Sequence, residues 1–226
     1  MLKLTFFLQL ILLVVMVSCS HTKPTSGISI ATATTGLMKN HIAPFPVYLT
    51  ETLESRTELE KKYSSDLFIV HIGHILKPNL TKEQNEKTLS SLKDLGINLV
   101  NLTLEDFTIA EAQGINFENY PQTFLNSTVV DLTQDGLVSG ENIVSYNVHN
   151  GVAFIGLSDT QLDKKLPKEK FIISDYVLSI LKVKKTALKT ATPTTINSFI
   201  LIHHLGTGIN EVMERLPPSF INSLAD

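Results

Sequence analysis

A short apolar run, Leu67–Leu76, lies between two segments whose patterns are typical of helices. A run of this length in such a setting predicts a strand that is buried on both faces, as in a sheet covered by helices. The run contains the sequence His71-Ile-Gly-His74 at its carboxyl side. Because open α/β sheets bind ligands beyond the carboxyl ends of their strands, we expect this strand to deliver two histidines to a candidate site.

The segment after this strand predicts a helix and then a second strand. Thr81 is expected to begin the helix, with Gln84 three residues later at the spacing of a capping box. Gly96 stands where a helix often ends, and 97–102 is a strand pattern. Three leucines are expected on the buried face, Leu89, Leu92 and Leu95. This spacing predicts two parallel neighbouring strands joined by a right-handed crossover.

A hairpin is the clearest local prediction in the second half of the chain. Asn150 and Gly151 stand between two apolar segments, 143–148 and 152–157, and Asn-Gly favours a two-residue hairpin turn. Other patterns predict elements elsewhere. These are strands over 28–33, 128–131 and 196–202, a loop over 36–46, and helices over 47–63, 175–189 and 208–216.

The helix expected over 175–189 has an apolar face and a run of lysines. Val177, Leu181 and Leu188 are expected to share the buried face. The lysines are Lys182, Lys184, Lys185 and Lys189. A solvated face is the preferred interpretation of this charge run, and contact with anionic lipid is the alternative.

The N-terminus has the pattern of a targeting signal. Lys3 is followed by a nearly uninterrupted apolar run from Leu4 to Val17, and then by Ser18 and Cys19. The run is too short for a comfortable membrane-spanning helix, which needs about 20 residues. A cysteine here resembles the lipobox of bacterial lipoproteins, although Met16 stands where that family usually has leucine. An ordinary secretory signal cut elsewhere is the alternative.

The lipobox resemblance divides the chain into three parts. We expect a signal peptide over 1–18, a lipidated tether over 19–27 and one domain over 28–226. Cys19 is the single cysteine, as suits a lipid attachment point. The resemblance implies a bacterial envelope protein, held by its lipid at the periplasmic face of a membrane, with the outer membrane slightly favoured. The net charge of −3 gives no basic excess, so nucleic acid is not expected as a partner.

The order of the predicted elements resembles the metallophosphoesterase domain of the periplasmic 5′-nucleotidase type, related to calcineurin-like phosphatases. The resemblance covers about 28–216 and lies in the framework of the domain. It implies an α/β fold of two packed mixed sheets with helices on both outer faces, a four-layer sandwich. The segments that carry it are 89–102, 144–157, 175–181 and 200–206.

The resemblance also implies a site with two divalent metals that clamp a phosphoryl group and a bound hydroxide. Such a family builds the site from Asp, His and Asn at strand ends, with a carboxylate bridging the ions. Here the opening Asp-x-His block falls on 34–36, which has neither residue type. The Gly-Asp block that supplies the bridging aspartate falls on Gly73-His74.

The later blocks depart from the family as well. The Asn-His block falls near Leu104-Glu105, where Glu105 and Asp106 are the nearby carboxylates. The histidine of the Ser-His-Leu-Gly block is matched by His204, and no Gly-His-x-His sequence follows it. No residue is therefore predicted to be catalytic, and the expected role is binding or scaffolding at the envelope, without a cofactor and with an unidentified envelope protein as a possible partner.

Two other kinds of site are considered. His74 and His204, with a nearby carboxylate, could bind a single zinc or manganese ion, and the protein would then be a divergent metal-dependent phosphoesterase. His71 and His203 are not expected to join them. His71 is three positions from His74 and His203 is next to His204, and at both spacings the side chains of an extended strand point to opposite faces. A Ser-His-Asp site would use Ser158, Asp159 and His204, but the chain has no Gly-x-Ser-x-Gly elbow.

Overall fold

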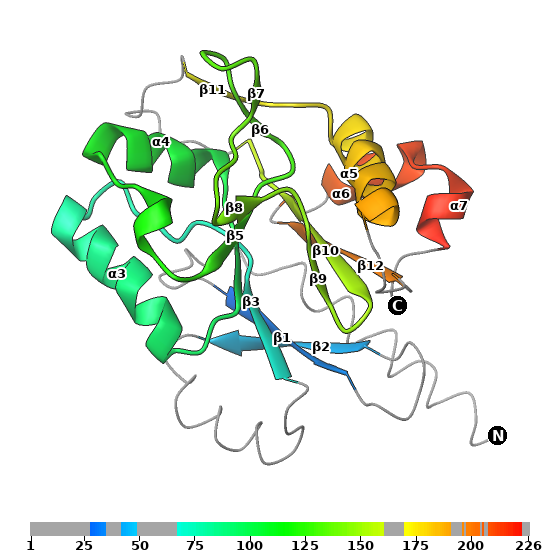
Figure 1. The fold of residues 1–226 in the computed structure, drawn as a ribbon, viewed down its shortest axis with the longest axis horizontal. Helices are drawn as coiled ribbons and strands as arrows, with labels where there is room; N and C mark the ends of the chain where they lie inside the picture. Colours follow the sequence, from blue (N-terminus) through cyan, green and yellow to red (C-terminus); the bar gives the residue numbers. More distant parts are fainter. Residues whose placement is uncertain are drawn as a thin grey trace.

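The structure is a computed structural model that describes residues 28–34, 42–48, 67–160, 170–190, 196, 198–203, 205 and 208–222. Within these ranges, two sheets lie face to face, and helices cover the outer face of each (Figure 1). The helices α3 and α4 lie on one flank, and α5, α6 and α7 lie on the other. The predicted fold of two packed mixed sheets flanked by helices is confirmed. The predicted signal peptide and tether lie outside the described residues.

The larger sheet has six strands in the order β2-β1-β3-β4-β5-β8. Its strands β3, β4, β5 and β8 are parallel, whereas β1 pairs antiparallel with β2 and with β3. The predicted parallel pairing of the two strands around the helix that begins after Thr81 is therefore confirmed. Strand β5 was not predicted. The bounds are β1 Ile28–Thr34, β2 Ile42–Tyr48, β3 Leu67–His71, β4 Leu99–Asn101, β5 Thr123–Leu125 and β8 Ile143–Val144.

Strand β2 corrects two predictions. Residues 42–46 were expected in a loop and residues 47–48 in a helix, yet all belong to β2. Pro44 and Pro46 suggested a loop because proline cannot donate to a ladder. Since β2 is at the edge of its sheet, both prolines can occupy positions that face away from β1. The rest of the predicted helix, 49–63, lies outside the described residues.

The smaller facing sheet has three strands in the order β12-β10-β9. Its strands are β9 Asn147–His149, β10 Val152–Leu157 and β12 Ser198–His203, with β10 parallel to β12. The hairpin prediction is confirmed, because His149 pairs with Val152 around Asn150 and Gly151. Both turn residues have positive φ, 49° and 78°, as a type I′ turn requires. The segment expected as one strand over 143–148 is divided between the two sheets.

Alternation along the strands separates three cores. On β10, Val152 and Phe154 face the larger sheet, while Ala153 and Ile155 face the helices α5 to α7. On β3, Phe68 belongs to the core between the sheets. These strands are apolar on both faces because they are covered on both faces, and that is why their sequences show continuous apolar runs.

Five helices and a 3-10 turn are described outside the sheets. Helix α3 has the predicted capping box, with Thr81 Oγ1 accepting from Gln84 N and Gln84 Oε1 accepting from Thr81 N. Helix α4 was not predicted, and Leu188 of α5 is 52% exposed, so its predicted burial is wrong. The bounds are α3 Lys82–Asp94, α4 Leu104–Gln113, η3 Phe117–Asn119, α5 Tyr176–Thr190, α6 Gly208–Arg215 and α7 Pro218–Ile221.

A third, small sheet in the order β11-β6-β7 packs against α4. Its strands are β6 Val129–Asp131, β7 Gly136–Leu137 and β11 Phe171–Ile173. Only β6 was predicted. In the part of the chain that the structure describes, no helix is long and apolar enough to cross a membrane.

Candidate functional site

The candidate site begins where the chain leaves β3. After His71 the backbone turns through Gly73, with φ of 125°, and His74, with φ of 56°. A Cβ at Gly73 would lie 2.5 Å from Thr103 Cγ2, so this position accepts glycine alone without movement of its neighbours. A non-glycine residue at positive φ costs about 1–2 kcal/mol, and His74 adopts it because its polar groups are held by other segments.

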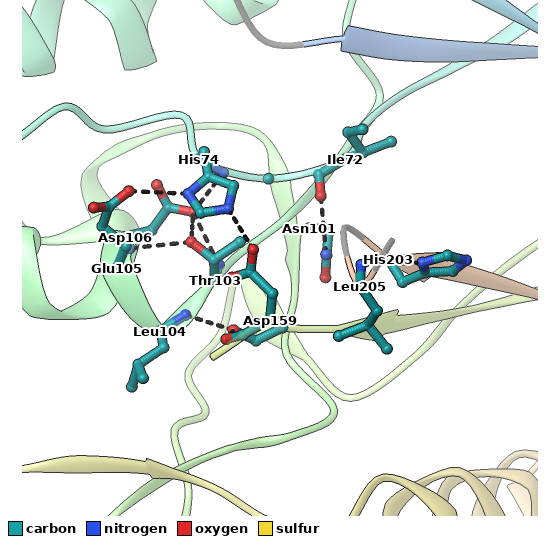
Figure 2. Close-up of polar contacts among 12 residues, drawn as sticks. Ile72, His74, Asn101, Thr103, Leu104, Glu105, Asp106, Asp159, His203 and Leu205 are labelled. Atoms are coloured by element: carbon teal, nitrogen blue, oxygen red, sulfur yellow. Dashed lines mark hydrogen bonds and ion pairs between the residues drawn. The ribbon is translucent and has the colours of Figure 1, made fainter. Parts of the chain in front are cut away.

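The ring of His74 lies between two carboxylates (Figure 2). Its Nδ1 is 2.9 Å from Glu105 Oε2, and its Nε2 is 2.9 Å from Asp159 Oδ2. Glu105 is in the first turn of α4, and Asp159 follows β10 in the facing sheet. The imidazole therefore connects the end of β3 with both the helical layer and the second sheet.

Asp106 holds the same loop by hydrogen bonds to its backbone. Its carboxylate accepts hydrogen bonds from the backbone N–H groups of His74 at 3.1 Å, Leu76 at 2.9 Å and Thr103 at 2.9 Å. The hydroxyl of Thr103 donates a fourth at 2.8 Å, and the same pair forms the capping box of α4. Burial raises the pKa of Asp106, while these donors and the charge of His74 lower it.

The surroundings of His74 favour its protonated form. Burial alone would lower the pKa of His74, but hydrogen bonds to Asp159 and Glu105 and the charges of Asp159 and Asp106 raise it to about 10. At neutral pH the ring is an imidazolium that donates one N–H to each carboxylate. The positive charge between the two carboxylates is therefore supplied by the side chain of His74 itself.

His71, the other histidine of the same stretch, is in the neutral form. It is fully buried, and its Nδ1 accepts a hydrogen bond from Gly73 N at 3.2 Å. Burial, together with the charges of Lys77 and His74, lowers the pKa of His71 to about 3. The ring is therefore neutral, and within the described residues its Nε2 has no hydrogen-bond partner. His71 does not join the cluster around His74.

Asn101 links the ends of three strands beside this cluster. Its Nδ2 donates to Ile72 O at 3.1 Å and to Leu157 O at 3.0 Å, from β4 across to the facing sheet. A Cβ at Gly156 would overlap Asn101 Oδ1, so a glycine is needed for this approach. Sequence reasoning did not assign Asn101 a role in the site.

The remaining predicted histidines do not complete a site in the described residues. His203 Nδ1 accepts from Leu205 N at 3.3 Å, and the ring of His203 points away from His74 (Figure 2). His204 lies outside the described residues, so its predicted role stays a prediction. Ser158 accepts from Leu104 N at 2.6 Å and donates to Asp159 O, and it forms no bond with a ring nitrogen of His74. The Ser-His-Asp alternative needs His204, which lies outside the described residues, so it stays a prediction.

With His74 protonated, the described residues around it do not offer a metal site. Both ring nitrogens of His74 are engaged by carboxylates, and an imidazolium cannot be a ligand. Among the described residues, no group of three or more His, Cys, Asp and Glu side chains is placed to hold a metal ion. The proposed ligand pair of His74 and His204 is left as a prediction, because its second member is not described.

Comparison with known proteins supports the fold and nothing finer. No protein-family model and no curated protein matches the sequence. Among solved structures, the chain is similar to the sulfate thiohydrolase SoxB of Thermus thermophilus in complex with glycerol, with a TM-score of 0.57 and 14% identity. The match covers 74% of this chain and 31% of SoxB. SoxB has a 5′-nucleotidase-like metallophosphoesterase fold, and the likeness shows a distant relationship of fold.

The two carboxylates that hold His74 differ in how far sequence alone could identify them. Glu105 and Asp106 were recognised as nearby carboxylates, and the capping-box spacing of Thr103 and Asp106 could also have predicted α4. Asp159 was considered only with Ser158. It is 85 residues from His74 in the chain, and no local pattern links two residues so far apart.

Proposed function

We propose that this protein is an envelope lipoprotein whose metallophosphoesterase-like domain acts in binding or scaffolding and does not hydrolyse phosphoesters. The observation that carries the proposal is the position of His74. The sequence resemblance matches this residue to a bridging aspartate, and its ring lies 2.9 Å from both Glu105 and Asp159. The internal imidazolium thus stands where that resemblance implies a metal-bridging carboxylate.

Charge explains why this substitution opposes the family's chemistry. Two neighbouring divalent cations repel each other, and a bridging carboxylate offsets that repulsion. Replacing the carboxylate by an imidazolium removes a negative charge and adds a positive one. Glu105 and Asp159, the carboxylates available to a cation, are already bonded to His74. A proton on His74 and a bound metal therefore compete for the same oxygens.

The first experiment measures metal and activity together. Protein purified without chelator and offered zinc and manganese is analysed for metal content, and its hydrolysis of a generic phosphodiester and of nucleotides is followed. The proposal expects less than stoichiometric metal and no hydrolysis above background from a cooperatively unfolding protein. Stoichiometric metal that is lost in His74→Ala, with activity lost in parallel, contradicts it.

A divergent metal-dependent phosphoesterase is the second candidate. The carboxylates of Glu105, Asp106 and Asp159 around His74 favour it, since oxygen and imidazole ligands suit zinc or manganese. His204 would supply a second imidazole. The matched variant His203→Ala separates the two candidates, because it removes a neighbouring imidazole that has no proposed ligand role. Metal loss in His204→Ala but not in His203→Ala supports the enzyme.

The envelope location needs its own test. It rests on the pattern from Lys3 to Cys19. In bacteria fed a labelled fatty acid, the protein is expected to take up label and to fractionate with membranes. The variant Cys19→Ala should lose the label, whereas Ser20→Ala should keep it. Equal labelling of both variants, or none in the parent protein, contradicts a lipid at Cys19.

A further inference from the structure

Helix α5 has one face packed on the protein and another that carries a row of lysines. Its buried residues are Val177, Ile180, Val183 and Ala187, which pack against β10 and β12. Leu178 is 69% exposed, and the residues four, seven and eleven positions later are all lysines on the exposed side. We call this surface the α5 stripe, consisting of Leu178, Lys182, Lys185 and Lys189.

The charges of this helix are not balanced within the helix. α5 contains four lysines and no acidic residue. Because the whole chain has a formal net charge of −3, the residues outside α5 carry −7. Lysines spaced by three and four positions repel each other, and each such pair destabilises a helix slightly. In the described residues, no carboxylate forms an ion pair with Lys182, Lys185 or Lys189.

The fourth lysine of α5, Lys184, packs against aromatic rings of the protein. Lys184 turns toward α7, with its Nζ 4.7 Å from the ring centroid of Phe220 and 5.5 Å from that of Phe199. Burial lowers the pKa of Lys184. The stripe lysines make no such ring contact among the described residues. Lys184 is therefore packed within the protein, whereas Lys182, Lys185 and Lys189 are exposed.

We propose that the α5 stripe docks on an anionic phospholipid surface. A row of lysines complements the negative surface of a membrane, and exposed leucines beside them can enter the boundary between headgroups and acyl chains. Leu178 begins the row, and Leu188, which is 52% exposed, lies beside its last turn. The choice of a lipid partner rests on the proposed membrane location. If the stripe does not dock on lipid, the proposal of a non-catalytic domain still stands, because that proposal is tested by metal content and phosphoester hydrolysis.

The test follows the reactivity of individual lysines. The full-length protein is reconstituted into vesicles of phosphatidylcholine alone or with phosphatidylglycerol, and amine acylation is measured residue by residue by mass spectrometry. Acylation of Lys182, Lys185 and Lys189 is expected to slow about fivefold or more in anionic vesicles, because each lysine gains about that factor at an anionic surface. Lys87 and Lys93 of α3, both exposed, should be unaffected.

A matched pair of variants distinguishes the stripe from total charge. In Lys182→Gln/Lys185→Gln, the protection of Lys189 is expected to disappear. In Lys87→Gln/Lys93→Gln, which removes the same charge from α3, it should remain. The protection should also vanish at about 1 M salt, where the screening length falls to about 3 Å.

Three outcomes overturn the proposal. The first is equal acylation of the stripe in neutral and anionic vesicles. The second is protection that both variants lose alike. The third is protection by an added acidic polypeptide without any effect of lipid, which would make the stripe a protein-binding surface.

Discussion

A single side chain, His74, joins three parts of the molecule. Its ring bonds Glu105 and Asp159, and the backbone N–H of His74 donates to Asp106. With 14% of its side chain exposed, His74 is shielded enough for its charge to matter and is held by partners from two layers. Removing one member of a buried ion pair costs more than the pair contributes, because the partner charges stay behind.

The variant His74→Gln is therefore expected to destabilise the protein by about 2–4 kcal/mol, somewhat below the range for fully buried pairs. Urea unfolding measures the change. Arg215→Gln is the control, because Arg215 and Asp175 form a pair at 2.7 Å in which the arginine is 59% exposed. That pair is expected to contribute less than about 1 kcal/mol. Equal effects of the two variants would show that His74 is not a structural cation.

The same residue makes stability depend on pH. The pKa of His74 is about 10 in the folded protein, against 6.5 for an unperturbed histidine such as that of the unfolded chain. Since the folded pKa is raised, the stabilisation is fully present below pH 6.5 and is lost as the pH rises toward 10. The difference in unfolding free energy between the parent protein and His74→Gln should shrink over this window.

A difference that stays constant between these pH values would contradict a charged His74. His71 does not disturb this measurement, because its lowered pKa of about 3 leaves it neutral in the folded protein throughout the window. Its contribution is present above pH 6.5 and is lost as the pH falls toward 3.

At the scale of the element, the turn after β3 positions the cluster. Gly73 has φ of 125°, and a Cβ there would meet Thr103 Cγ2 at 2.5 Å. Thr103 is the N-cap of α4. The turn thus packs on the N-cap residue of the helix that supplies Glu105 and Asp106.

Gly73→Ala is expected to destabilise the protein by about 2–4 kcal/mol through backbone strain and this contact. Gly136→Ala is the control, because the nearest atom to a Cβ there is 3.7 Å away. Adding Thr103→Ser to Gly73→Ala removes the clashing methyl group and keeps the capping hydroxyl, so it should recover part of the loss. Thermal unfolding of the four proteins tests this, and the absence of any recovery would assign the cost to the backbone alone.

At the scale of the whole molecule, Asn101 connects the two sheets. It is fully buried, and it donates to Ile72 O and Leu157 O from opposite sheets. The same burial prevents Asn101 from serving as a glycosylation acceptor in the folded protein, although it begins an Asn-x-Thr sequence. The sheets therefore meet at a polar contact beside the candidate site.

Asn101→Ala is expected to cost about 2–4 kcal/mol, because two buried carbonyl groups lose their donor. The control is Asn116→Ala, which removes an exposed cap of η3 and should cost about 1 kcal/mol or less. Chemical denaturation of both variants gives the comparison. A loss in Asn101→Ala no greater than in Asn116→Ala would mean that water satisfies the carbonyls equally well.

Features that depend on neighbouring residues could be predicted from the sequence. The capping box of Thr81 and Gln84 and the turn at Asn150 and Gly151 follow from hydrogen bonds and φ preferences within a few positions. The parallel pairing around α3 follows from the order strand, helix, strand and the right-handed crossover that this order favours. The continuous apolar run at β3 also predicted a strand covered on both faces, since burial on both faces leaves such a run. These properties require no knowledge of distant contacts.

Tertiary structure alone decided which distant residues meet. The bond between His74 and Asp159 joins positions 85 residues apart, and the edge position that admits the prolines of β2 depends on which strands pair beside it. The charge on His74 follows from that meeting, because the pKa of a side chain is set by its burial and by the charges around it. A local pattern can identify a histidine at a strand end, but only the packed sheets decide whether it is an imidazolium or a metal ligand.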